Sequence, residues 1–218
     1  MNNFSQRIVT SLILLLILSI TLFFNKYILL FGLILCSLVL FIEFNNLTKK
    51  IWKKKKSTIA RINIISLLFL VIFIYVSYEF YNKLLLFIIS ICIFSDTGGY
   101  IVGNLIGGKK LTKISPKKTI SGSVGSFIFS LFPIIIFWMY QNIIQVNFSI
   151  EYYLKLIPVC LFLCLICQLG DLFISYFKRM ANVSDTGSIL PGHGGLLDRI
   201  DGVIFVIPTA YIINKIFF

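Results

Sequence analysis

The sequence predicts an all-α polytopic membrane protein with about seven transmembrane helices, on the strength of three observations. Hydrophobic residues make up 58% of the 218 residues, and the mean hydropathy is +0.97. The apolar residues come in runs of roughly 17 to 20, the length that crosses a bilayer. A soluble domain is closer to half apolar. The runs occupy the whole chain, so we expect one integral membrane domain over residues 1–218.

The first apolar run is too long for the core of a signal peptide and has no small-residue cleavage site after it. We therefore expect it to be retained as a helix. The expected spans are 8–24, 27–44, 62–80, 84–102, 123–140, 154–177 and 200–217.

The distribution of basic residues predicts the orientation of these spans. The most basic stretch, 49–56, lies between the second and third spans, and we place it in the cytoplasm. The N-terminus and the loops 103–122 and 178–199 then share that side, with sixteen of the twenty Lys and Arg residues. The net charge of +12 therefore indicates orientation and contact with anionic lipid headgroups, and we expect no nucleic-acid partner.

Glu43 is a carboxylate near the expected cytoplasmic end of the second span. An ionisable residue inside a membrane helix suggests a function by default. A residue at the end of a helix can equally reach water, and the sequence leaves both interpretations open.

The loop between the fourth and fifth spans combines glycines with positive charge. Asp96 lies inside the fourth span, where a carboxylate needs a partner or a cation. The glycines let backbone amides approach an anion, and the start of the fifth span offers further amides. We favour a phosphate site over a loop whose small residues only pack helices. Four lysines add positive charge: Lys109, Lys110, Lys117 and Lys118.

The richest polar stretch runs from the end of the sixth span into the seventh. Asp171, Ser175 and Lys178 share one helical face, and Arg179 follows. Two helices can bring Asp171 and Asp198 together, and such carboxylates repel unless a cation joins them. We expect Mg²⁺, because it takes a few carboxylate oxygens and keeps other positions for phosphate and water. The alternative is that Asp198 pairs with Arg199, or Asp171 with a lysine, to hold the helices together.

We expect Asp198 and Asp201 to lie on one face of the seventh span. His193, the only histidine, stands between glycines. A hydrogen-bonding or acid–base role and a structural role are both open for it.

The polar stretch resembles the C-terminal motif of the phosphatidate cytidylyltransferases, also called CDP-diacylglycerol synthases. The matching residues are Ser175-x-x-Lys178-Arg179, Asp185 and Leu190-Pro191-Gly192-His193-Gly194-Gly195-x-x-Asp198-Arg199-x-Asp201. Asp96-Thr97-Gly98-x-Tyr100-x-x-Gly103 and Ile114-Ser115-Pro116-Lys117-Lys118-Thr119 agree as well, as do Arg7-Ile8 and Glu43-Phe44. Two positions depart from the family pattern: Ser184 stands where Lys is usual, and Ser121 where Glu is usual.

The resemblance implies a single integral membrane cytidylyltransferase domain that acts in phospholipid biosynthesis. It would transfer CMP from CTP to phosphatidate, giving CDP-diacylglycerol and pyrophosphate. The expected location is the inner (plasma) membrane of a bacterium, among membrane lipids, with the active site at the cytoplasmic side. A homodimer is left open.

The resemblance also implies roles for individual residues. Asp171 and Asp198 would hold the Mg²⁺ ion, and a second cation is left open. Catalytic roles are expected for Asp171, Asp198, Lys178, Arg179, His193 and Arg199. Contacts with substrate or cofactor are expected at Asp96, Lys117, Lys118, Ser175, Asp185, Gly192, Gly194, Gly195 and Asp201.

Two other functions compete with this one. A CTP-dependent lipid kinase of the polyprenol type would transfer the γ-phosphate instead of CMP. A transporter of an anionic solute would also use carboxylates inside the membrane, such as Asp96 and Asp171.

Overall fold

The computed structural model describes residues 3–53, 55–81, 83–143, 149–192 and 194–217, and the regular structure within these ranges is helical. Five helical segments are long and apolar enough to cross a membrane: Lys26–Ile51, Lys56–Glu79, Leu84–Ile106, Ile120–Met139 and Ile150–Met180. Two shorter apolar segments are Leu12–Leu22 and Val203–Ile216. The all-helical membrane fold is therefore confirmed, while the count of seven spans stays a prediction.

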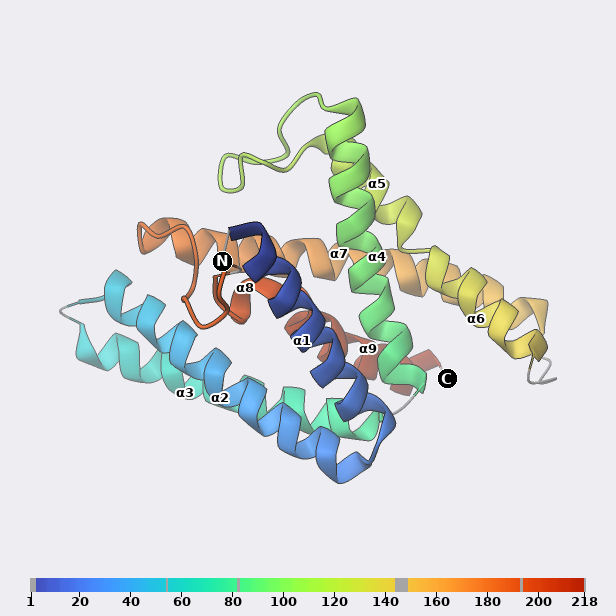
Figure 1. The fold of residues 1–218 in the computed structure, drawn as a ribbon, viewed down its shortest axis with the longest axis horizontal. Helices are drawn as coiled ribbons and strands as arrows, with labels where there is room; N and C mark the ends of the chain where they lie inside the picture. Colours follow the sequence, from blue (N-terminus) through green and yellow to red (C-terminus); the bar gives the residue numbers. More distant parts are fainter. Residues whose placement is uncertain (1–2, 54, 82, 144–148, 193, 218) are drawn as a thin grey trace. The chain divides into compact units, whose positions relative to one another are not determined.

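The chain, drawn as a ribbon in Figure 1, folds into compact units. Two such units alternate along the sequence. The first unit comprises Met1–Lys83 and Ile174–Asp201, and the second comprises Leu84–Phe173 and Gly202–Phe218. The first unit thus combines the N-terminal part of the chain with Ile174–Asp201, a segment about ninety residues later. This segment carries most of the expected site residues.

In the first unit, α2 (Lys26–Ile51) and α3 (Lys56–Glu79) pack side by side, and α1 (Asn3–Phe23) lies against α2. The Asn25 side chain caps α2 by accepting a hydrogen bond from the Tyr27 amide at 3.0 Å. Between α2 and α3, Asn63 donates to Asn45 at 2.8 Å. The short helix α8 (Leu197–Ile200) completes this unit beside α2.

The second unit contains α4 (Lys83–Ile106), α5 (Ile120–Phe129), α6 (Phe132–Ile143), most of α7 (Ile150–Met180) and α9 (Val203–Phe217). Glycines let α4 and α5 approach to backbone contact. A Cβ atom at Gly122 would lie 2.7 Å from the carbonyl oxygen of Gly99, and one at Gly125 would lie 2.8 Å from that of Gly98. Small residues are the usual means of close helix packing in membranes, where apolar contact alone does not favour association.

The expected fifth span, 123–140, is two helices in the structure. The helix α5 ends at Phe129, and α6 begins at Phe132. Pro133 gives the physical reason, because it has no amide to donate to the Phe129 carbonyl and its ring crowds that carbonyl.

The expected seventh span, 200–217, begins later than the sequence suggested. Asp198 lies in the four-residue helix α8 and Asp201 is its C-cap, so the two carboxylates do not open one long helix. The long helix α9 starts at Val203. Gly202 lies between the two helices, and a Cβ there would lie 3.0 Å from the Cys167 carbonyl, so the close packing needs a glycine.

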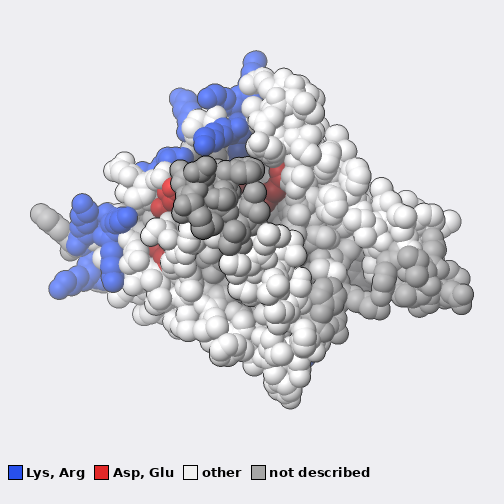
Figure 2. Space-filling model, viewed as in Figure 1, with Lys and Arg blue, Asp and Glu red and all other residues white. Residues whose placement is uncertain are grey.

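On the face shown in Figure 2, Lys and Arg gather in two basic patches, and a few Asp and Glu are also visible. Large hydrophobic side chains are exposed on α2, α3, α4 and α7, as expected for helices that face lipid. One basic patch lies at the turn between α2 and α3, where the described lysines are Lys49, Lys50, Lys53, Lys55 and Lys56. The other lies on the loop between α4 and α5, which carries Lys109, Lys110, Lys113 and Lys117.

We expect Gly125→Ala to destabilise the protein, because the new methyl group would lie 2.5 Å from the Val102 Cβ. Overpacking of this kind costs about 1–3 kcal/mol, and thermal unfolding in detergent measures it. Val124→Leu is the matched control, because Val124 lies on the same helix with 53% of its surface exposed. Equal unfolding midpoints for the two variants would contradict the close approach of α4 and α5.

Candidate active site

A cavity of about 310 Å³ lies in the second unit. It is lined by residues of α4, α5, α7 and the loop between α4 and α5, and we call it the α4–α5–α7 cavity. Glycines on α4 and α5 expose backbone to it, at Gly99, Gly103 and Gly122. Its polar side chains include Asp96, Asn104, Ser115, Lys117, Lys118, Thr119, Ser123, Gln168 and Asp171.

Charges of both signs line this cavity. Lys118 forms an ion pair with Asp171, with 29% and 27% of the two side chains exposed. Asp96 supplies a second carboxylate and Lys117 a second ammonium. The Ser123 hydroxyl donates to the Gln168 side-chain oxygen at 2.6 Å, which connects α5 to α7. The arrangement suits a ligand that carries phosphates and a cation, because it offers ammonium donors and carboxylate oxygens together.

The loop beside the cavity is held by backbone hydrogen bonds. The Leu111 amide donates to the Lys118 carbonyl at 2.8 Å, and the Ile120 amide donates to the Lys109 carbonyl at 2.9 Å. The Thr119 hydroxyl accepts from the Gly122 amide at 3.0 Å and so caps α5. This amide is therefore already hydrogen-bonded, although the sequence suggested that it would be free for phosphate.

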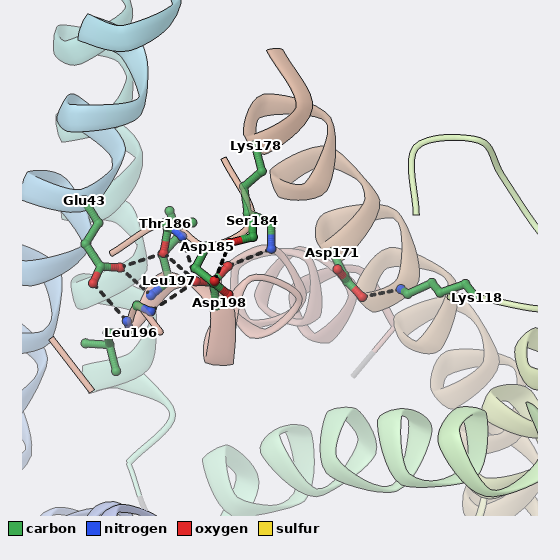
Figure 3. A network of polar contacts seen from close by, with 11 residues as sticks. Glu43, Lys118, Asp171, Lys178, Ser184, Asp185, Thr186, Leu196, Leu197 and Asp198 are labelled. Atoms are coloured by element: carbon green, nitrogen blue, oxygen red, sulfur yellow. Dashed lines mark hydrogen bonds and ion pairs between the residues drawn. The ribbon is translucent and has the colours of Figure 1, made fainter. Parts of the chain in front are cut away.

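A second polar group lies in the first unit around Glu43, which is only 2% exposed on α2 (Figure 3). We call Glu43, Thr186, Leu196, Leu197 and Asp198 the Glu43 cluster. The two Glu43 carboxylate oxygens accept hydrogen bonds from the amides of Leu196 at 3.0 Å and Leu197 at 2.8 Å. The Thr186 hydroxyl donates to Glu43 at 3.1 Å. The view that Glu43 simply reaches water is therefore wrong.

Asp198 is the most fully hydrogen-bonded carboxylate of the cluster. Its Oδ1 forms an ion pair with the Lys178 ammonium at 2.7 Å, with 12% and 6% of the two side chains exposed. Its Oδ2 accepts from the Thr186 amide at 2.8 Å, the Thr186 hydroxyl at 2.9 Å and the Gly195 amide at 3.1 Å. Burial alone would raise the pKa of Asp198, but Lys178 and these amides outweigh it and lower the pKa below its ordinary value.

Glycine is required in the segment that leads into α8. Gly192 and Gly194 have φ angles of +74° and +82°, in the left-handed region that other residues rarely adopt. The Gly195 amide donates to Asp198, so it is already hydrogen-bonded within the protein. His193 lies outside the described residues.

The other predicted site residues of the first unit lie on α7, on α8 and in the segment between them. Ser175 is buried on α7, and Arg179 is exposed in the last turn of the same helix. Asp185 is exposed and accepts a hydrogen bond from the Ser184 hydroxyl at 2.6 Å. Arg199 is exposed on α8, and Asp201 caps that helix.

The expected metal ligands fall into different environments. Asp171 shares the α4–α5–α7 cavity with Asp96, so hard oxygen donors suited to Mg²⁺ line one space. Both oxygens of Asp198 already accept hydrogen bonds. Among the residues that the structure describes, no three His, Cys, Asp or Glu side chains gather as a metal-binding group. Asp171 lies in the second unit and Asp198 in the first, and an ion shared by them stays a prediction.

Sequence reasoning missed two of the polar partners. Thr186 touches both carboxylates of the Glu43 cluster, but a lone threonine in a loop carries no signal of this. Gln168 lines the α4–α5–α7 cavity. It lies one helical turn before Asp171 in an otherwise apolar stretch, and that spacing could have identified it.

Comparison with known proteins gives a family match. Residues 79–217, more than half of the chain, match the model of the cytidylyltransferase family. The chain is similar to proteins named phosphatidate cytidylyltransferase. The one from Bacillus subtilis is 40% identical over 124 residues, which cover 56% of this chain and 44% of that protein.

Two further relatives carry the same name. The one from Staphylococcus saprophyticus is 44% identical over 130 residues, 59% of this chain and 48% of that protein. The one from Rickettsia typhi is 42% identical over 145 residues, which cover 65% of this chain and 63% of that protein. The matched stretches thus span about half the length of these curated relatives.

We expect Asp198→Asn to lower the unfolding free energy on the order of 3 kcal/mol, because it leaves the Lys178 ammonium buried without its counter-charge. Lys178→Met should cost a similar amount, and the double variant should cost less than the sum. Unfolding in mixed detergent measures all three. Asp185→Asn is the control, because its carboxylate is exposed and should change stability little. Additive losses in the double variant would contradict the pair.

The stabilisation by Asp198 should depend on pH. The pKa of Asp198 is lower in the folded protein than the ordinary value of 3.8. Asp198 therefore makes its full contribution to the unfolding free energy when the pH is above this ordinary value. The contribution is lost as the pH falls through the lower pKa of the folded state. The difference in unfolding midpoint between the wild type and Asp198→Asn should therefore be constant near neutral pH and narrow below about pH 4. A difference that widens in acid would contradict this assignment.

Proposed function

Because this chain belongs to the cytidylyltransferase family, we propose that it transfers CMP from CTP to phosphatidate, giving CDP-diacylglycerol and pyrophosphate in phospholipid biosynthesis. The observation that carries the proposal is the family match over residues 79–217, which includes the whole α4–α5–α7 cavity. The names of the bacterial relatives support phosphatidate as the acceptor.

In this reaction an oxygen of the lipid phosphate attacks the α-phosphorus of CTP. A new phosphorus–oxygen bond forms, the bond between the α-phosphorus and the bridging oxygen breaks, and pyrophosphate leaves with that oxygen. Such transfers depend on positioning and on neutralising phosphate charge more than on covalent chemistry of the protein. The cavity supports this role with the ammonium groups of Lys117 and Lys118.

The ion pair between Lys118 and Asp171 has a consequence for nucleotide binding. A triphosphate that enters the cavity competes with the Asp171 carboxylate for the Lys118 ammonium. Exchange of one anionic partner for another avoids leaving the ammonium unpaired. We propose that the released Asp171 carboxylate then faces the cation that accompanies the triphosphate.

We propose Mg²⁺ as that cation, with Asp171 as a ligand and Asp96 as a second carboxylate of the same cavity. When bound, Mg²⁺ would neutralise phosphate charge and so make the α-phosphorus easier to attack. Three basic residues remain predicted contacts for phosphate oxygens: Lys178, Arg179 and Arg199. Contacts with the substrates also remain predicted for Ser175, Asp185 and Asp201.

We further propose that the active site faces the cytoplasm from a bacterial inner membrane. The turn between α2 and α3 and the loop between α4 and α5 carry the two basic patches. Lys and Arg concentrate on the cytoplasmic side of membrane proteins, where CTP is also present. The acyl chains of phosphatidate would remain in the bilayer, and a homodimer stays an open prediction.

The purified protein should label phosphatidate with the α-phosphate of CTP when Mg²⁺ is present. Label at the γ-position should appear in pyrophosphate and not in lipid. Lipid extraction after incubation with each labelled nucleotide measures this directly. Incorporation of the γ-label would support the lipid kinase instead, and solute flux into vesicles without nucleotide turnover would support the transporter.

We expect Lys118→Ala to raise the KM for CTP by about tenfold, because it removes a charge-assisted contact with phosphate. Lys113→Ala is the matched control, because Lys113 lies in the same loop, is exposed and does not line the cavity. Both variants change the net charge equally, so initial rates over a range of CTP concentrations separate a local contact from general attraction. Equal KM values for the two variants would refute the role of Lys118.

A further inference from the structure

Glu43 lies outside the stretch that matches the family model, which begins at residue 79. It is nevertheless bound to the segment that carries most of the predicted motif. Its three hydrogen-bond donors come from Thr186, Leu196 and Leu197, at least 143 positions later in the chain. A carboxylate that is 2% exposed and accepts three hydrogen bonds has a defined partner set.

The contact between Glu43 and this segment is close enough to restrict the residues there. A Cβ atom at Gly187 would lie 2.7 Å from Glu43 Oε1, and one at Gly195 would lie 2.6 Å from Glu43 Oε2. A side chain at either position would displace the Glu43 carboxylate, and one at Gly195 would also lie 2.8 Å from the Gly187 amide nitrogen. The two glycines thus let the backbone of this segment approach the carboxylate.

Thr186 connects Glu43 to Asp198. Its hydroxyl oxygen lies 3.1 Å from Glu43 Oε2 and 2.9 Å from Asp198 Oδ2. A hydroxyl group has one proton to donate, so the two carboxylates share it. The Thr186 amide donates to Asp198 as well, at 2.8 Å. Displacement of Thr186 from Glu43 would therefore also disturb Asp198 and, through it, Lys178 (Figure 3).

We infer that Glu43 is a positioning residue that fixes residues 184–192 and 194–198 in the conformation in which Asp198 pairs with Lys178. It touches no substrate in this role. It acts by holding the amides at the start of α8 and the hydroxyl of Thr186. The effect on catalysis rests on the proposed function, whereas the effect on the segment itself does not.

Hydrogen–deuterium exchange of the detergent-solubilised protein tests the structural part. In Glu43→Ala, peptides that cover 184–198 should exchange about tenfold faster or more, because the two amides lose their acceptor. Peptides from the loop 107–119 should be unchanged. Glu43→Gln keeps one accepting oxygen and should fall between the wild type and Glu43→Ala. Unchanged exchange over 184–198 in both variants would overturn the inference.

Ser37→Ala is the matched control. Ser37 lies on α2 like Glu43, is 6% exposed, and its hydroxyl has no hydrogen-bond partner among the residues that the structure describes. It tests whether any change of a buried polar residue on α2 loosens the segment. Faster exchange over 184–198 in Ser37→Ala would overturn a specific role of Glu43. If Glu43→Ala does not fold, Thr186→Ala tests the same connection, and Thr186→Ser should restore it.

Steady-state kinetics test the catalytic part. Glu43→Ala should raise the KM for CTP by about tenfold, because phosphate-binding side chains lose their fixed position. A smaller amount of folded protein would lower the maximal rate and leave KM unchanged. Faster exchange with wild-type KM would refute the positioning role. If the wild type transfers no CMP, the proposed function fails, and the exchange experiment still decides whether Glu43 holds the segment.

Discussion

A carboxylate buried among apolar helices must be met by hydrogen-bond donors, because an ionised oxygen without them costs several kcal/mol. Three acidic side chains meet this requirement in different ways. Glu43 accepts from backbone amides and a hydroxyl, Asp198 accepts from amides and a lysine, and Asp171 pairs with a lysine beside a cavity. These partnerships hold the polar segments together with the backbone hydrogen bonds of the loops.

The carboxylates of Glu43 and Asp198 differ from that of Asp171 in how accessible they are to a ligand. Glu43 and Asp198 have partners on both oxygens and little exposure, which suits residues that hold a segment in place. Asp171 has more than a quarter of its side chain exposed beside Lys118. An ion pair at the wall of a cavity can exchange partners with an incoming phosphate, so it combines stability with access.

The sequence pointed to individual polar residues more readily than to their hydrogen-bond partners. Asp171, Lys118 and Asp198 stood out because charge is scarce in this chain, and scarcity can be read without coordinates. The acceptor role of Glu43 could not be read, because its donors include main-chain amides at Leu196 and Leu197, and every residue except proline has an amide. Long-range hydrogen bonds to backbone leave no pattern in the residues that donate them.

For the helices as well, some features could be predicted from the sequence and others could not. Hydrophobic runs located the helices, since burial in lipid depends on apolar length. The division of one expected span into α5 and α6 follows from Pro133, a local signal that outweighs the apolar run. Just before α9, Gly202 packs against Cys167 on α7, a contact that the linear pattern does not contain.

The alternation of the two units along the chain has a consequence for biogenesis. The ribosome adds Leu196 153 residues after Glu43, which at typical rates of synthesis is a delay of roughly 10–30 s. During that time the α2 carboxylate lacks its native donors, although α2 and α3 can already be inserted as a helical hairpin. The N-terminal unit therefore reaches its final packing only after the segment before α9 has left the ribosome.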